Sequence, residues 1–88
     1  MDKTLIDDME LCHKGIKEAR IKIAEVRFRI NAKKSSLWEK ATGTVDAKKD
    51  YIKSKIADDL KEIELLEADI EWYNNHIDLL TWKLMDNE

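Results

Sequence analysis

The stretch CHKGIKEARIKIAEVRFRI, residues 12–30, decides the fold because its apolar residues return every three or four positions. In an α-helix this alternation places apolar side chains in one narrow stripe, the seam along which two helices pack in a coiled coil. The stripe extends in both directions and contains Leu5, Met9, Cys12, Ile16, Ala19, Ile23, Val26, Ile30 and Leu37, with Lys33 in a polar position. The first half of the chain is therefore predicted to form a long helix, at about 3–41.

The second half of the chain repeats the same spacing. Its stripe consists of Val45, Ile52, Ile56, Ile63, Leu66, Ile70, Tyr73, Ile77, Leu80 and Leu84, with Lys49 and Asp59 as polar exceptions. Between the two stripes the segment ATGTVD, residues 41–46, combines glycine with β-branched and helix-capping residues. Such a segment favours the end of one helix and the start of the next. We predict a turn at about 42–46 and a second helix at about 47–86.

The short connection makes the two helices antiparallel neighbours. The predicted fold class is all-α: residues 1–88 form a single domain, an antiparallel helical hairpin of the coiled-coil type. A composition with 40% charged and 43% hydrophobic residues, no proline and two glycines is typical of long helices. Residues 1–40 carry ten Lys or Arg against seven Asp or Glu, and residues 41–88 carry six against twelve, which favours packing of one half on the other.

The register of the hairpin follows from the seam. Pairing residues whose numbers add up to about 89 places the seam positions of the two helices opposite each other throughout. The same register brings Lys33 and Asp59 into neighbouring layers, where a polar pair fixes the register. The flanking ion pairs that this register predicts are Arg20 with Glu67, Lys22 with Asp69, and Arg29 with Glu62.

A second apolar stripe follows the opposite face of the second helix. It consists of Leu65, Ala68, Trp72, Asn75, Leu79 and Trp82. A two-helix hairpin has nothing that covers this face, and exposed apolar patches rich in tryptophan usually mark interaction sites. We predict that the face is the core of a homo-oligomeric helical bundle in which Asn75 sets the register, and the alternative is a groove for another protein's helix. A weaker outer cluster on the first helix, at Ile21, Phe28 and Ala32, can close the same assembly.

The sequence contains no motif of enzymatic chemistry: it has no glycine-rich phosphate loop, no nucleophile motif, and no CxxC or HExxH pattern. Cys12, His13 and His76 are predicted at the same end of the hairpin. However, Cys12 belongs to the seam and the histidines flank opposite sides of it, so four metal ligands do not converge. We expect no catalytic residue, no cofactor and no metal. The single cysteine and the absence of a signal or spanning segment predict a cytoplasmic protein that makes no use of the membrane.

The basic residues of the first helix have the composition of a nucleic-acid-binding stripe. Several of them are expected to pair with acidic residues across the hairpin. The remaining candidates for contact with nucleic acid are Lys14, Lys17, Arg27, Lys33 and Lys34. Binding through such residues depends on salt and not on base sequence.

The segments LWEKATG (37–43), ADD (57–59), IEWY (70–73) and LL (79–80) resemble the central region of UvsY-type phage recombination mediators, over roughly residues 20–85. In that family a helix ends in an aromatic-rich segment with a glycine, and a second helix carries an Ile-Glu-aromatic-aromatic stretch. The resemblance implies a homo-oligomer that binds single-stranded DNA and helps to load a recombinase onto it. The chain departs from the family in its net charge of −3 and in lacking a C-terminal basic and aromatic segment.

Two functions follow from these patterns. The first is a non-enzymatic, self-associating coiled-coil adaptor, a phage protein of DNA recombination that contacts single-stranded DNA and a recombinase. The alternative is a small inhibitor or regulator that binds a host or defence protein through the outer face of the second helix, where Trp72, Trp82 and neighbouring acidic residues make the contact.

Overall fold

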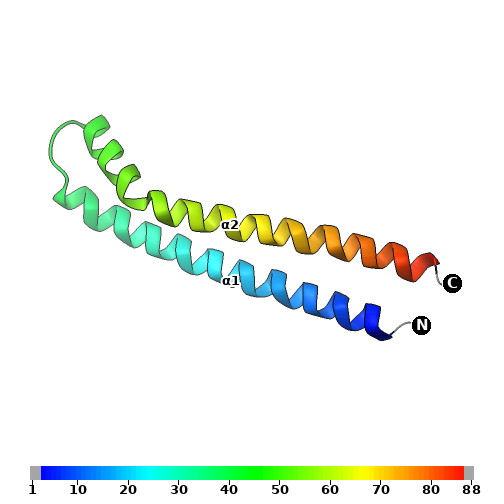
Figure 1. Cartoon of the computed structure of the whole chain (residues 1–88). Helices are drawn as coiled ribbons and strands as arrows, with labels where there is room; N and C mark the ends of the chain where they lie inside the picture. The colour runs from blue at the N-terminus through cyan, green and yellow to red at the C-terminus, as the bar shows by residue number, and fades with distance from the viewer. Residues whose placement is uncertain (1–2, 87–88) are drawn as a thin grey trace.

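The computed structural model describes residues 3–86 and shows a hairpin of two α-helices (Figure 1). Helix α1 spans Lys3–Lys40 and helix α2 spans Val45–Asp86. The helices run antiparallel, side by side, so the first and last described residues lie at the same end of a rod of 66 × 17 × 13 Å (Figure 1). The predicted all-α hairpin is confirmed, and its assembly into an oligomer stays a prediction. Residues 1–2 and 87–88 of the predicted domain lie outside the described residues.

The connection between the helices consists of residues 41–44. Gly43 has a φ of 100°, a backbone conformation that side chains with a Cβ rarely adopt, so glycine suits this position. Thr44 caps α2, because its Oγ1 accepts a hydrogen bond from the backbone N–H of Ala47 at 3.1 Å. Helix α2 starts two residues earlier than the predicted start at about 47, since the cap is Thr44.

The core is a single layer of side chains between the two helices, and every buried side chain belongs to the predicted seam. The largest cluster contains Val26, Ile30, Ile52 and Ile56, with Leu37 and Ile63 packed against it. The remaining buried residues are Cys12, Ile16, Ala19 and Ile23 of α1 and Asp59 and Leu80 of α2. Two helices cannot surround their seam, so its flanks remain open to water.

The seam ends before the turn. Val45 is 56% exposed and Lys49 is also exposed, although the spacing places both in the seam. The first turns of α2 bend away from α1 (Figure 1), which leaves both side chains open to water. The prediction that the second stripe packs from Val45 onward is therefore wrong, and the first buried residue of α2 is Ile52.

A charged layer interrupts the apolar seam near its middle. Asp59 is only 6% exposed, and its two carboxylate oxygens accept hydrogen bonds from Lys33 at 2.7 Å and from Arg29 at 3.0 and 3.2 Å. Arg29 also donates to Glu62 at 2.7 Å. The predicted pairs of Lys33 with Asp59 and of Arg29 with Glu62 are thus confirmed. Glu67, however, lies 3.7 Å from Arg27 and not beside Arg20, because the long Arg27 side chain reaches along the outside of the hairpin.

The charged layer shifts the pKa values of two of its members. The hydrogen bond from Lys33, reinforced by the one from Arg29, lowers the pKa of Asp59 against the opposing effect of burial. The hydrogen bonds to Asp59 and then Glu62 raise the pKa of Arg29. The layer is therefore fully charged at neutral pH, and a slipped register would leave the Asp59 carboxylate among isoleucines without its partners.

Gly15 lets a side chain of α2 pack directly against the backbone of α1. The Tyr73 ring lies directly over Gly15: a Cβ at that position would fall 2.7 Å from Cε2 and 2.9 Å from Cε1 of the ring, and would overlap Cζ. Any side chain at position 15 would push the ring out of the seam. The glycine and the charged layer thus specify the same register at two separate points along the rod.

Candidate association surface

The six residues of the second stripe form one exposed face of α2, opposite the seam. The side chains of Leu65, Trp72, Leu79 and Trp82 are between 50% and 65% exposed, and Ala68 and Asn75 are exposed as well. We call these six residues the outer face. With a rise of about 1.5 Å per residue, the outer face extends for roughly 26 Å along α2.

Trp72, in the middle of the outer face, is held by its neighbours. Its indole stacks on the His76 ring at a centroid distance of 5.1 Å and an angle of 12°. The Tyr73 ring meets it edge-on at 5.3 Å and 78°. Tyr73 itself lies over Gly15, so Trp72 sits beside a ring that belongs to the seam.

The outer face continues onto α1 through Leu11. This leucine is 64% exposed and lines a groove of about 490 Å³ together with Gly15, Trp72 and His76. Sequence reasoning missed Leu11 because it lies outside the seam spacing of α1. The seam register could have indicated Leu11. It places the helical turn of α1 that precedes Gly15 beside the helical turn of α2 that carries Trp72 and His76.

The weaker outer cluster of α1 is also exposed. Phe28 is 77% and Ile21 51% exposed, and Ala32 lies on the same helix in an exposed position. These side chains do not join the groove that Leu11 forms with Trp72. The cluster is thus a separate and smaller apolar feature of the hairpin surface.

The five basic residues predicted to contact nucleic acid do not form one free cluster. Lys33 is bound to Asp59 at 2.7 Å, Arg27 lies 3.7 Å from Glu67, and Lys14 lies 4.0 Å from Glu18. Within residues 3–86, Lys17 and Lys34 have no ion pair. Three of the five charges are therefore partly neutralised by neighbouring carboxylates.

The cysteine and the histidines take different environments. Cys12 is buried in the seam, His13 is exposed, and His76 stacks on Trp72. Among the described residues, no group of three or more His, Cys, Asp or Glu side chains could hold a metal ion. In the same part of the chain, neither helix includes a stretch long and apolar enough to span a membrane.

No protein-family model, curated protein or solved structure matches this chain.

Proposed function

We propose that the protein is a non-enzymatic, self-associating helical-hairpin adaptor in which the outer face of α2 packs against the outer face of a second copy. The observation that carries this proposal is the exposure of four large apolar side chains, Leu65, Trp72, Leu79 and Trp82, with the same three-four spacing as the buried seam. Removing apolar surface from water is favourable by about 25 cal/mol per Å². A contiguous apolar face of this kind is typical of an interface.

The outer face is complementary to itself. When two copies of α2 pack antiparallel about a point between Tyr73 and Asn74, each apolar position of one copy meets a position of the same stripe in the other. The facing pairs, one residue from each copy, are Leu65 with Trp82, Ala68 with Leu79, and Trp72 with Asn75. Ala68 then faces the larger Leu79, and Asn75 faces the larger Trp72, which favours dense packing. A two-fold arrangement of this type closes on itself.

One lysine beside the largely acidic outer face favours an antiparallel orientation of a second copy. In the antiparallel arrangement Lys83 of one copy comes close to Asp69 of the other. Each such exposed pair contributes only about 0.2–1 kcal/mol, but pairs of opposite charge favour one orientation over the other. The two-fold relation produces each contact twice.

The test is the mass of a charged variant. Trp72→Glu combined with Leu79→Glu puts like charges into the centre of the outer face, and we expect sedimentation equilibrium to give the monomer mass of 10.4 kDa. The matched control is Tyr51→Glu with Val45→Glu, which introduces the same charges at exposed apolar residues outside the outer face. The control should keep the mass of the unmodified protein, and both variants should keep their helical circular dichroism. An unchanged mass of the outer-face variant would sink the proposal.

The contact with single-stranded DNA and a recombinase, which the resemblance implies, stays a prediction of this adaptor. Lys17 and Lys34 are the candidates that no carboxylate holds in the described part of the chain. Binding of single-stranded DNA is measured by the fluorescence anisotropy of a labelled oligonucleotide at low and at moderate salt. Binding that becomes weaker at higher salt, and weaker in the Lys17→Gln and Lys34→Gln variants, supports the mediator function. An absence of binding at low salt excludes the mediator function.

The same sedimentation experiment distinguishes the self-associating adaptor from the alternative, an inhibitor of a host or defence protein. It requires that the unmodified protein leaves Trp72 and Trp82 free. A monomeric unmodified protein would favour it, because the outer face would then be available to another protein's helix.

A further inference from the structure

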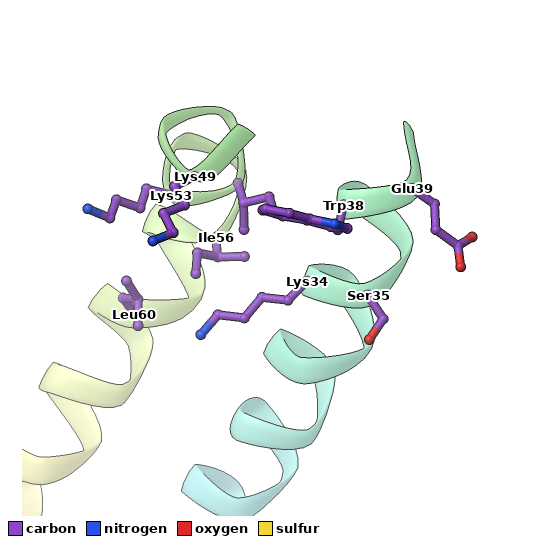
Figure 2. A pocket seen from close by; sticks show the side chains of 9 residues that line it. Lys34, Ser35, Trp38, Glu39, Lys49, Lys53, Ile56 and Leu60 are labelled. Carbon is purple, nitrogen blue, oxygen red and sulfur yellow. The ribbon is translucent and has the colours of Figure 1, made fainter. Parts of the chain in front are cut away.

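A pocket of about 770 Å³ lies between the helices at the turn end of the hairpin. It exists because the first turns of α2 bend away from α1 (Figure 1), so the helices separate where the seam ends. Its apolar residues are Trp38 from α1 and Ile52, Ile56 and Leu60 from α2. Figure 2 shows Trp38 extending from α1 towards α2 across this opening. The pocket is therefore a trough between two helices, and its size is that of many small-molecule sites.

The trough has a buried floor and wetted walls. Ile52 and Ile56 are 7% and 3% exposed, whereas Trp38 and Leu60 on the two sides are 40% and 45% exposed. The ammonium of Lys48 lies 5.0 Å from the centre of the Trp38 ring, a cation–π contact that holds the indole and covers part of it. The apolar surface is thus formed before a ligand binds, and water in contact with its walls is available for displacement.

Three lysines are among the residues that line this apolar trough. Lys34 comes from α1, Lys49 and Lys53 come from α2, and none of the three has an ion pair within residues 3–86. Glu39 is the one carboxylate that lines the pocket in the described part of the chain, and Figure 2 shows its side chain pointing away from α2. The pocket therefore combines an apolar interior with flexible cationic groups that can close on an anion.

The wider surroundings have the same sign of charge. Residues 34–55 contain six lysines and three acidic residues, a formal net charge of +3 in a chain whose total is −3. The turn end is thus a positive region on an otherwise acidic protein, and it attracts anions before contact.

We propose that this turn-end pocket binds a small organic anion with a linear apolar body, of the type of a medium-chain fatty acid carboxylate. The alkyl chain lies along the trough beside Ile56 and Leu60, and the carboxylate meets the lysines at the rim. The lining residues of α2 run from Lys49 to Leu60, roughly 16 Å along the helix, which matches an extended chain of medium length. This site uses no residue of the outer face and holds whether or not the protein associates through that face.

A peptide fits this pocket less well than an alkyl chain. The lining residues belong to two helices whose backbone N–H and C=O groups are engaged within the helices, so an entering peptide backbone would leave its own polar groups unpaired. A nucleic-acid strand requires a stripe of cations and free aromatic faces for its bases. In this pocket the lysines line a single trough and form no stripe. Lys48 covers part of the Trp38 face.

The experiment is a titration of the full chain with dodecanoate, below the concentration at which micelles form, followed through the Trp38 indole N–H in ¹H–¹⁵N spectra. A Trp38→Phe variant assigns the signal. Dodecan-1-ol supplies the chain without the charge, and acetate supplies the charge without the chain. We expect a saturable shift with dodecanoate and affinity at least about tenfold weaker for both comparison molecules, since charge and apolar chain each contribute.

Substitutions distinguish binding in the pocket from a general attraction of the anion to positive charge. The triple change Lys34→Gln, Lys49→Gln and Lys53→Gln should weaken dodecanoate binding about tenfold, because each partly exposed ion pair contributes modestly. The control removes the same charge elsewhere, by Lys17→Gln, Lys22→Gln and Lys61→Gln, and should leave the affinity within about twofold. Leu60→Gln, at a half-exposed wall position that the fold tolerates, should also weaken binding.

Four results would overturn the proposal. These are no saturable shift of the Trp38 signal, equal affinity for dodecan-1-ol, equal weakening by the two triple variants, and no effect of Leu60→Gln. If an oligonucleotide or an acidic peptide shifts the Trp38 signal at lower concentration than dodecanoate, the pocket belongs to that class of ligand and the fatty-acid assignment is wrong.

Discussion

The two apolar stripes of α2 have the same three-four spacing, yet one is covered and the other is open to water. In the seam, Ile56 and Leu80 are 3% and 2% exposed, whereas Leu65 and Trp72 of the outer face are 61% and 59% exposed. The difference comes from the connection: four residues tie α1 to the seam of α2, so the seam packs within one molecule. The outer face needs a second molecule, and its burial depends on concentration.

The stripes also differ in what specifies their register. The seam contains the charged layer around Asp59 and the contact of Tyr73 on Gly15, two features that a slip of the helices would disrupt. The outer face has only one polar residue, Asn75, among its six. We therefore expect a single pairing of α1 with α2 and a looser, more easily altered contact between copies.

The largest effect should come from the seam. Ile56→Ala removes a side chain from the main cluster and should lower the free energy of unfolding by about 2–4 kcal/mol, because the hairpin is left with a cavity. Leu79→Ala on the outer face should change it by no more than about 0.5 kcal/mol at dilutions where the protein is monomeric. Urea titration measures both. Equal losses at the two positions would mean that the outer face is covered within one molecule.

Acid should weaken the seam through its charged layer. Because the pKa of Asp59 is lowered in the fold, the layer contributes stability above the unfolded pKa of about 4, and this contribution is lost as the pH falls through the lowered value. The melting temperature should fall as the pH drops below about 4, and the fall should be smaller in Asp59→Asn, which is less stable at pH 7. An unchanged pH profile in Asp59→Asn would exclude this origin of the acid sensitivity.

Gly15→Ala tests the second feature that specifies the seam register. Alanine gains up to about 1 kcal/mol in helix propensity, but displacing the Tyr73 ring costs about 1–3 kcal/mol, so a net loss of about 1 kcal/mol is expected. Adding Tyr73→Leu should reverse the sign, since the smaller side chain leaves room for the alanine Cβ. If thermal unfolding shows Gly15→Ala alone to be stabilising, the close contact does not specify the register.

The smallest effect should come from the turn that joins the two halves of the seam. Thr44→Ala removes the hydrogen bond to the N–H of Ala47 and should lower the free energy of unfolding by about 1 kcal/mol. Thr42→Ala, two residues earlier in the same turn, should change it by less than about 0.5 kcal/mol. Equal losses in urea titration would show that Thr44 acts through general turn geometry and not as a cap.

The seam could be predicted because spacing alone determines which residues of a long helix share a stripe. The pairs of Lys33 with Asp59 and of Arg29 with Glu62 could be predicted because register follows from the same spacing. The start of the seam in α2 could not be predicted, because the bend that leaves Val45 exposed depends on how the chain leaves the turn. The turn-end pocket arises from the same bend, so no periodic pattern indicates it.

The outer face could be predicted as a stripe, but its extension to Leu11 required the contact between helices to be known. Pairings between exposed charges were the least predictable feature. Glu67 lies beside Arg27 instead of Arg20 because long side chains reach neighbours a turn or more away at little cost. Spacing thus predicts apolar layers well and flanking charges poorly.

The most direct test of the central claim is the light-scattering mass of the unmodified protein over a series of concentrations. Association through the outer face predicts a defined multiple of 10.4 kDa that decreases towards the monomer on dilution. A constant mass of 10.4 kDa at every concentration would contradict the claim and leave the outer face of α2 free for a different protein.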